Sequence, residues 1–249
     1  MDAVSRRYHG EQHGRTEPGR YLRDKTRLCD WLQQLFHSHG SPGEEWKIPQ
    51  TFIKPILPGP RYLTQNIIEA LPSGAPDVSP RLYLLDCSEP EERIQADWPR
   101  FYQYLEQGKA HAIDAAYLAS HRVPWYSQEQ RPPAPFLCTY MGRSRNGKHP
   151  FRFIWNRSRA TAHNVYLMLY PRARLQDALT HHPELTAHVF EALQRITPEE
   201  LLSEGRVYGG GLHKVEPREL AQITARPVLD AIEAHVRIDH QMEMFAETH

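Results

Sequence analysis

The stretch from Arg122 to Arg174 constrains the fold of this chain most, because three short strand-like runs follow one another there. Residues 136–141, 151–155 and 165–170 are rich in aromatic and β-branched side chains, and polar, glycine-containing turns separate them. Such runs are typical of strands joined by loops. The simplest arrangement that they predict is a meander of three strands with basic residues on the connecting loops.

The segments on either side of this stretch carry other patterns. Apolar residues at helical spacing predict a helix over residues 24–37, and the proline-rich run at 48–63 should wrap over a surface rather than join a central strand. A strand is predicted at 82–86. Helices are predicted from residue 88, divided at Pro99 and stopped by Gly108, and again around 111–121.

Helical patterns return after the basic stretch. Residues 183–195 are predicted to be helical, and at 197–203 Thr197 and Glu200 have the spacing of a capping box. A final amphipathic helix carries Leu229, Ile232, Val236 and Met242 on one face. The predicted fold class is α+β, with a small mixed or antiparallel sheet, flanking helices and long proline-rich loops.

The charge of the stretch from Arg122 to Arg174 is unusual for a neutral chain. The whole chain has 30 basic and 30 acidic residues, but this stretch has one acid, Glu129, against ten basic residues. Its net charge of +9 leaves −9 for the rest of the chain. The basic residues are Arg122, Arg131, Arg143, Arg145, Lys148, Arg152, Arg157, Arg159, Arg172 and Arg174. Such a concentration indicates a site for a polyanion, with nucleic acid the leading candidate.

Length and cysteine content bound the organisation of the chain. With 249 residues it can bury one sizeable core or two small ones. We predict a poorly ordered or short helical extension over residues 1–45 and one domain over 46–249. Cys29, Cys87 and Cys138 lack paired spacing, which indicates buried thiols in a reducing compartment. With no signal peptide and no bilayer-spanning apolar run, we expect a cytoplasmic protein without a membrane partner.

Several kinds of chemistry lack their motifs here. The sequence contains no phosphate-binding loop, no dinucleotide-binding glycine motif and no nucleophile elbow. Its histidine pairs, such as His181 with His182, have no cysteine or carboxylate constellation nearby, so we predict no metal site. The glycine run at 209–211 is either a flexible turn or a place where the backbone approaches phosphate.

The candidate DNA-binding residues are those whose side chains can contact phosphates, base edges or base faces. Arginine binds phosphate or guanine bidentately, asparagine pairs with adenine, and aromatic rings stack or support the loops. The candidates are Trp125, Tyr126, Arg131, Arg143, Arg145, Lys148, Arg152, Asn156, Ser158, Arg159, Asn164, Gly209, Gly210, Gly211, His213 and Lys214. A solvated charged surface with ordinary core aromatics is the other interpretation of these residues.

Several blocks of the sequence, in order, resemble the C-terminal target-recognition region of γ-class N6-adenine DNA methyltransferases of type II restriction–modification systems, including enzymes fused to an endonuclease. The blocks are FIKPILPGPRYL at 52–63, RVPWYSQE at 122–129, YMGR at 140–143, FRFIWNRS at 151–158, NVYLMLYP at 164–171 and GRVYGGGLHKVEP at 205–217. The resemblance covers roughly residues 48–229.

The resemblance implies that DNA recognition and methyl transfer belong to different parts of the enzyme. In that family an N-terminal Rossmann-like domain binds S-adenosylmethionine, and an [NDS]-P-P-[YF] motif holds the target adenine flipped out of the duplex. Neither motif occurs in this chain. The resemblance therefore implies a module that reads double-stranded DNA and holds no cofactor itself. Catalysis and S-adenosylmethionine are expected on a separate methyltransferase chain, or on the missing part of a split or truncated gene.

Two other functions remain open from the sequence. The chain could be a protein-interaction or scaffold subunit whose basic surface meets an acidic partner. It could also be an intact enzyme of unfamiliar sequence, which would bind S-adenosylmethionine on its own.

Overall fold

The computed structural model describes residues 45–128, 131–143, 149–209, 211–223 and 226–234. The chain forms two compact units. Unit 1 comprises residues 1–53 and 85–128, and unit 2 comprises residues 54–84 and 129–249. The predicted helix at 24–37 lies outside the described residues, as does nearly all of the predicted extension over 1–45. The domain boundary after residue 45 stays a prediction.

Unit 1 consists mainly of helices. They are the 3-10 turn η1 (Gln50–Phe52), α2 (Glu91–Asp97), α3 (Pro99–Ala110) and α4 (Tyr117–Ser120). The predicted division at Pro99 is confirmed, because α2 ends at Asp97 and Pro99 is the first residue of α3. The helix predicted around 111–121 was wrong in extent. Ala112 has a φ of 55°, which turns the chain after α3 and leaves only the short α4.

The core of unit 1 forms where its helices meet the segment around η1. Phe52 packs edge-on against Trp98, with 5.2 Å between the ring centroids, and also lies against Phe101 of α3. The backbone N–H of Asp86 donates to the carbonyl of Phe52 at 2.8 Å, which ties the two parts of unit 1 together. Phe101, Leu105 and Ile94 are almost fully buried.

Unit 2 is built on a four-stranded sheet with the order β2-β6-β4-β7. The strands are β2 (Ile67–Ile68), β4 (Phe136–Thr139), β6 (Phe153–Asn156) and β7 (Tyr166–Leu169). β4 runs antiparallel to both β6 and β7, and β2 runs parallel to β6. The predicted strands exist, but the predicted meander order was wrong. β4 comes first in the chain yet lies between the other two, and all four of its residues are buried, as a central position requires.

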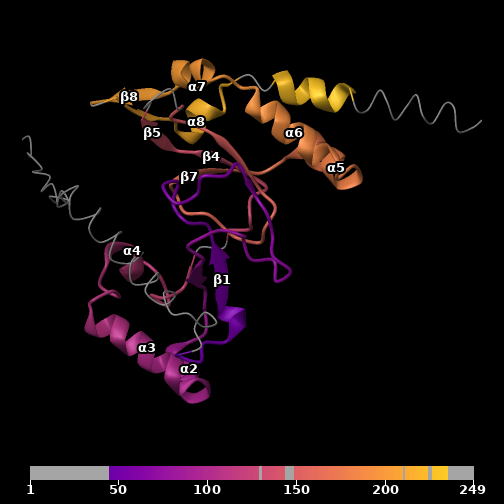
Figure 1. Cartoon of the computed structure of the whole chain (residues 1–249). Coiled ribbons are helices and arrows are strands. Elements are labelled where there is room, and N and C mark those ends of the chain that lie inside the picture. The colour runs from indigo at the N-terminus through magenta and orange to yellow at the C-terminus, as the bar shows by residue number, and fades with distance from the viewer. Residues whose placement is uncertain (1–44, 129–130, 144–148, 210, 224–225, 235–249) are drawn as a thin grey trace, which may run out of the picture. The chain divides into compact units, whose positions relative to one another are not determined.

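The two faces of this sheet pack against different parts of unit 2. Alternate residues such as Phe136 and Cys138 point into one apolar cluster, which also contains Val189 and Phe190 of α6 (Leu185–Gln194). α6 is anchored further by Gln194, whose amide donates to the carbonyl of Phe153 at 2.9 Å. In Figure 1, α6 and the preceding α5 (Ala173–His181) lie beside the strands of this sheet.

The opposite face is covered by the proline-rich run. Leu137 and Ile154 point into a second apolar cluster that contains Leu57 and Leu63 of that run. The hydroxyl of Tyr166 in β7 donates to the carbonyl of Pro58 at 2.7 Å. The prediction that this run wraps over a surface is therefore confirmed. Its beginning also forms a strand, because β1 (Ile53–Ile56) pairs with β3 (Leu82–Leu85) in a separate two-stranded sheet.

A third, three-stranded sheet has the order β5-β9-β8. Its strands are β5 (Met141–Arg143), β8 (Arg206–Tyr208) and β9 (Leu212–Lys214). The single strand predicted at 136–141 thus divides at Tyr140: its first part is the central strand β4, and β5 continues into the other sheet. β8 and β9 form an antiparallel hairpin, and Gly209 and Gly211 lie in the turn between them.

The remaining helices lie towards the C-terminus. α7 (Pro198–Glu204) begins at the predicted capping box, in which Thr197 and Glu200 each bond the other's backbone N–H. α8 is short (Pro217–Leu220), and residues 226–234 are helical and include Leu229 and Ile232 of the predicted final helix. Val236 and Met242 lie outside the described residues. The predicted α+β class with small mixed sheets is confirmed. In the part of the chain that is described, no helix is both long and apolar enough to cross a membrane.

Candidate nucleic-acid interface

A groove of about 680 Å³ lies in unit 2, where β5 meets the segment before β6 and the proline-rich run. We call it the basic groove. Three arginines and one histidine line it, and none of the described lining residues is acidic. The lining residues are Pro60, Arg61, Thr139, Met141, Gly142, Arg143, His149, Pro150, Arg152 and Leu212. The groove therefore concentrates positive charge from two segments that are distant in the sequence.

One wall of the basic groove depends on a close approach of two backbones. A Cβ atom at Gly142 would lie 2.0 Å from the carbonyl oxygen of Pro150, so only glycine fits at this point of β5. Next to it, the backbone N–H of Thr139 donates to the carbonyl of Arg152 at 3.1 Å. The backbone N–H of Arg152 donates to the Thr139 hydroxyl at 3.0 Å. The close approach at Gly142 thus sets β5, and the two hydrogen bonds of Thr139 set the end of β4, against the segment that leads into β6.

Arg152 joins this wall to the proline-rich run. Its guanidinium donates to the backbone carbonyls of Thr64 at 2.8 Å and Gln65 at 3.2 Å, to the Asn66 side chain at 3.1 Å, and to the carbonyl of Leu63. Burial lowers the pKa of the Arg152 guanidinium, but an arginine stays charged at neutral pH. Arg152 therefore brings positive charge to the groove while its donors hold the chain that follows Arg61.

Asn156 and Ser158 lie inside the fold. Asn156 is 5% exposed, and its amide donates to the carbonyls of Ala134 at 3.2 Å and Ala160 at 2.9 Å. Its side-chain oxygen accepts bonds from the backbone N–H of Ser158 at 3.2 Å and from the Ser158 hydroxyl at 2.6 Å. This geometry supports a structural role for both residues, which shape the turn after β6.

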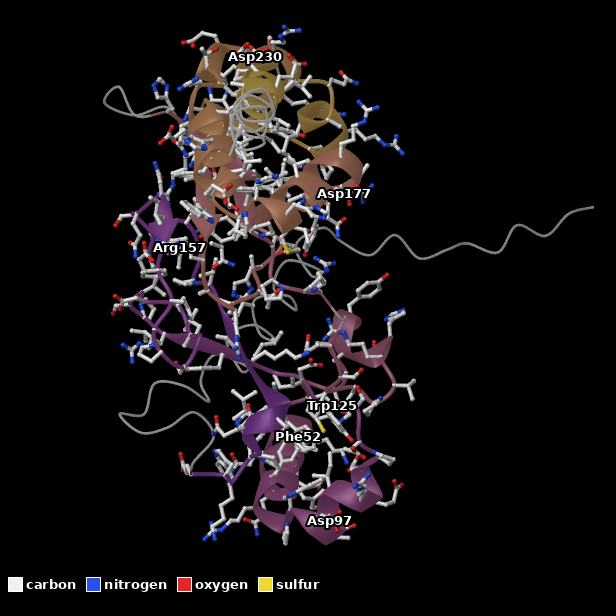
Figure 2. The ribbon with its side chains drawn as sticks, turned by 90° about the vertical axis from the view of Figure 1, so that its right-hand side faces the viewer. Phe52, Asp97, Trp125, Arg157, Asp177 and Asp230 are labelled. Carbon is white, nitrogen blue, oxygen red and sulfur yellow. The ribbon has the colours of Figure 1, made fainter. Side chains whose placement is uncertain are left out.

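The aromatic candidates Trp125 and Tyr126 belong to unit 1. Tyr126 is 1% exposed, packs edge-on against Trp125 with 5.5 Å between the ring centroids, and donates to the carbonyl of Glu89 at 2.6 Å. Figure 2 labels Trp125 on the ribbon of unit 1 and Arg157 on that of unit 2. Tyr126 is thus a core residue of unit 1, whereas all described residues that line the basic groove belong to unit 2.

The remaining arginine and asparagine candidates differ in their surroundings. Arg143, Arg131, Arg159 and Asn164 are exposed, and only Arg143 among them lines the basic groove. The stem of Arg159 lies over Gly74, which has a φ of 81°, so that a Cβ there would be 2.8 Å from the arginine Cδ. Arg145 and Lys148 lie outside the described residues.

The candidates of the β8–β9 hairpin have less free charge than the sequence indicates. Lys214 forms an ion pair with Glu216 at 2.6 Å and lies 5.0 Å from the centroid of the Tyr140 ring. The hydrogen bond to Glu216 raises the pKa of Lys214. His213 is partly buried, and its Nδ1 has no hydrogen-bond partner among the described residues. Gly209 and Gly211 are exposed in the turn, and Gly210 lies outside the described residues.

Two groove residues were missed by sequence reasoning. Arg61 lies outside the stretch of net charge +9, although within the proline-rich block on which the family resemblance rests. His149 lies inside the basic stretch, where a histidine is less conspicuous than the arginines around it. Only the packing of the proline-rich run over the sheet brings Arg61 to Arg143 in one groove.

The fold and the basic groove define a small α+β module with a cationic cleft, whose described lining residues include no acid. Residues 44–247 match the family model of the C-terminal domain of type II methyltransferase M.Eco57I. Because that match covers well over half of the chain, the chain belongs to this family of type II methyltransferase C-terminal domains.

Two curated relatives agree with this assignment. Type II methyltransferase M.XamI of Xanthomonas campestris pv. amaranthicola is 34% identical over 125 residues, which are 50% of this chain and 21% of the relative. Type II methyltransferase M.AccI of Acinetobacter calcoaceticus is 28% identical over 118 residues, 47% of this chain and 20% of the relative. The match thus spans about a fifth of each relative. No solved structure matches the chain.

Proposed function

We propose that this chain is the DNA-reading module of a site-specific adenine N6 methyltransferase of a restriction–modification system. It binds double-stranded DNA, and a catalytic domain or separate chain supplies the S-adenosylmethionine site and the methyl transfer. The observation that carries the proposal is the basic groove, in which Arg61, Arg143, His149 and Arg152 come together and no described lining residue is acidic. Membership of the type II methyltransferase family supports DNA as the polyanion.

The two exposed arginines of the groove are the residues that can contact a DNA duplex directly. Arg61 and Arg143 lie on separate segments and both reach solvent, so each can contact a phosphate or the edge of a guanine. Arg152 contributes its charge from a fixed position, because its donors are bound to protein oxygens. In this arrangement Arg61 and Arg143 make direct contacts and Arg152 holds the groove in shape.

The test is the salt dependence of duplex binding. Fluorescence anisotropy with a labelled 30-base-pair duplex is measured over a series of salt concentrations. The logarithm of affinity should fall steeply against the logarithm of salt concentration for the wild type. Arg61→Gln and Arg143→Gln should each weaken binding and reduce the slope by about 1. Arg195→Gln, at an exposed position after α6, is the matched control and should change neither. A wild-type affinity that stays flat with salt would contradict the proposal.

Sequence specificity is tested separately by selection from a pool of randomised duplexes. Enrichment of one short motif that contains an adenine supports a target-recognition role. Equal recovery of all sequences would reduce the function to non-specific DNA binding.

Two further measurements address the alternatives. Calorimetric titration of the chain with S-adenosylmethionine should show no heat of binding, because we expect the cofactor site on another domain or chain. Binding would favour an intact enzyme. If DNA binding is absent and charge reversal of Arg61 and Arg143 abolishes a complex with a methyltransferase subunit, the scaffold function is the correct one.

A further inference from the structure

Resting on the proposed function, we infer that Tyr208 is an aromatic DNA contact that extends the basic groove along the β8–β9 hairpin. Its contact is apolar and therefore insensitive to salt, in contrast to those of Arg61 and Arg143. Tyr208 lies in the block GRVYGGGLHKVEP at 205–217, but it is not one of the candidate DNA-binding residues predicted from the sequence.

Strand register places Tyr208 next to the groove. In the sheet β5-β9-β8, Arg143 is paired with Leu212, and Leu212 is paired with Tyr208. Directly paired residues of antiparallel strands project from the same face. Arg143, Leu212 and Tyr208 therefore form a row across one face of the sheet, and the first two of them line the basic groove.

The adjacent residue of the same strand points the other way. Val207 is paired with His213 and, through it, with Gly142, so these three residues belong to the opposite face. Val207 is 65% exposed and Tyr208 is 44% exposed. The two neighbours thus have similar access to solvent, but only Tyr208 shares a face with the groove residues.

The two positive charges that the hairpin itself places on the face of Tyr208 are already paired. Arg206 forms an ion pair with Glu219 at 2.7 Å, and Lys214 forms one with Glu216 at 2.6 Å. Both acids come from the start of α8, where they also form its capping box. The hairpin therefore adds little net charge to the groove, and what it offers on this face is the Tyr208 ring and the Leu212 side chain.

The hairpin is also open to solvent where a duplex would lie. All three residues of β8 are exposed, and a Cβ at Gly209 or Gly211 would meet no atom within 4 Å. Figure 1 shows β8 projecting beyond the neighbouring helices of unit 2. A β-ribbon that carries an exposed ring beside cationic side chains fits the sugars and base edges of a DNA groove, where proteins place apolar side chains.

The test compares Tyr208→Ala with Val207→Ala in the same anisotropy assay. Tyr208→Ala should weaken duplex binding about five-fold or more at every salt concentration and leave the slope unchanged, because the lost contact is apolar. Val207→Ala should bind like the wild type. Tyr208→Phe keeps the ring and should also bind like the wild type. Thermal unfolding midpoints establish that each variant is folded.

Tyr208→Lys gives a second, independent measurement. It adds a charge without a ring, so its slope should be steeper by about 1. At high salt, where charge is screened, it should bind several-fold more weakly than the wild type. The inference is overturned if Tyr208→Ala binds like Val207→Ala, if its slope falls as that of Arg143→Gln does, or if Tyr208→Lys matches the wild type at high salt. A wild type that binds no duplex would instead overturn the proposed function itself.

Discussion

Asn156 and Asn164 are two asparagines of the basic stretch that the fold uses in different ways. Asn156 is buried in four hydrogen bonds around the turn after β6, whereas Asn164 is exposed before β7. From the sequence both were candidate DNA-binding residues, since either amide could pair with adenine. Burial separates them, because a side chain whose donors and acceptor are occupied inside the protein has none left for a ligand.

This difference leads to a stability prediction. Asn156→Ala leaves the carbonyls of Ala134 and Ala160 without their donor, so the free energy of unfolding should fall by about 2–3 kcal/mol. Asn164→Ala should change it by less than about 0.5 kcal/mol. Urea denaturation followed by circular dichroism measures both. Equal effects of the two substitutions would show that the network around Asn156 does not stabilise the fold.

Gly142 provides the second prediction at this scale. Gly142→Ala places a Cβ 2.0 Å from the Pro150 carbonyl, so β5 or the Pro150 segment must move. We expect a loss of about 1–3 kcal/mol in the free energy of unfolding and weaker duplex binding, since both segments line the basic groove. Gly209→Ala is the matched control for stability, because no atom lies within 4 Å of its Cβ position. Unchanged stability and binding in Gly142→Ala would contradict the close backbone approach.

At the scale of elements, α7 is defined by its first turn. Thr197 accepts a hydrogen bond from the backbone N–H of Glu200 at 3.2 Å, and Glu200 accepts one from the backbone N–H of Thr197 at 2.7 Å. Thr197→Ala should lower the free energy of unfolding by about 1 kcal/mol, because it removes the acceptor for an otherwise unpaired N–H. Ser203→Ala, at an exposed site of the same helix, should have almost no effect. Denaturant titration of both variants would refute the role of the cap if their midpoints coincide.

The sequence predicted those elements whose signals are local. α7 begins at its capping box and α3 at Pro99, because caps and prolines act within one helical turn. The pairing between strands was harder to predict from the sequence. Nothing in residues 136–141 marks Tyr140 as the place where one run supplies strands to two sheets, since that depends on the distant hairpin β8–β9. The central place of β4 is set by non-local packing in the same way.

The candidate site was predictable to a similar degree. Arg143 was identified from charge alone, and the structure places it in the basic groove. Arg61 could not be grouped with it, because the proline-rich run crosses the sheet only in the folded chain. Two ion pairs could not be predicted either, because a sequence gives the number of charges but not which of them pair. They are Arg206 with Glu219 and Lys214 with Glu216.

At the scale of the whole molecule, the basic stretch has a net charge of +9, but only part of that charge lies in the basic groove. Arg157 pairs with Glu69 at 2.8 Å and lies over the Trp155 ring, while Arg152 bonds protein carbonyls. Arg61, from outside the stretch, joins the groove instead. The fold thus redistributes the positive charge that the composition describes, and the basic groove involves only part of the basic stretch.

The division into two units yields a prediction about unfolding, because the described part of each unit contains one buried cysteine. Cys87 in unit 1 is 1% exposed and Cys138 in unit 2 is 0% exposed. Burial raises the pKa of both thiols, that of Cys138 to about 12, so neither should react in the folded protein. In a Cys29→Ser background, alkylation at increasing urea followed by peptide mass spectrometry reports the opening of each unit separately.

If the units unfold independently, a core substitution should shift only the thiol of its own unit. Leu105→Ala removes a fully buried side chain from α3, so the urea midpoint for labelling Cys87 should fall while that of Cys138 stays in place. Val189→Ala in α6 should do the reverse, since Val189 and Cys138 share one apolar cluster. A common shift of both thiols in either variant would show a single cooperative unit instead. Independent unfolding would mean that the basic groove, formed by unit 2 residues, keeps its shape while unit 1 opens.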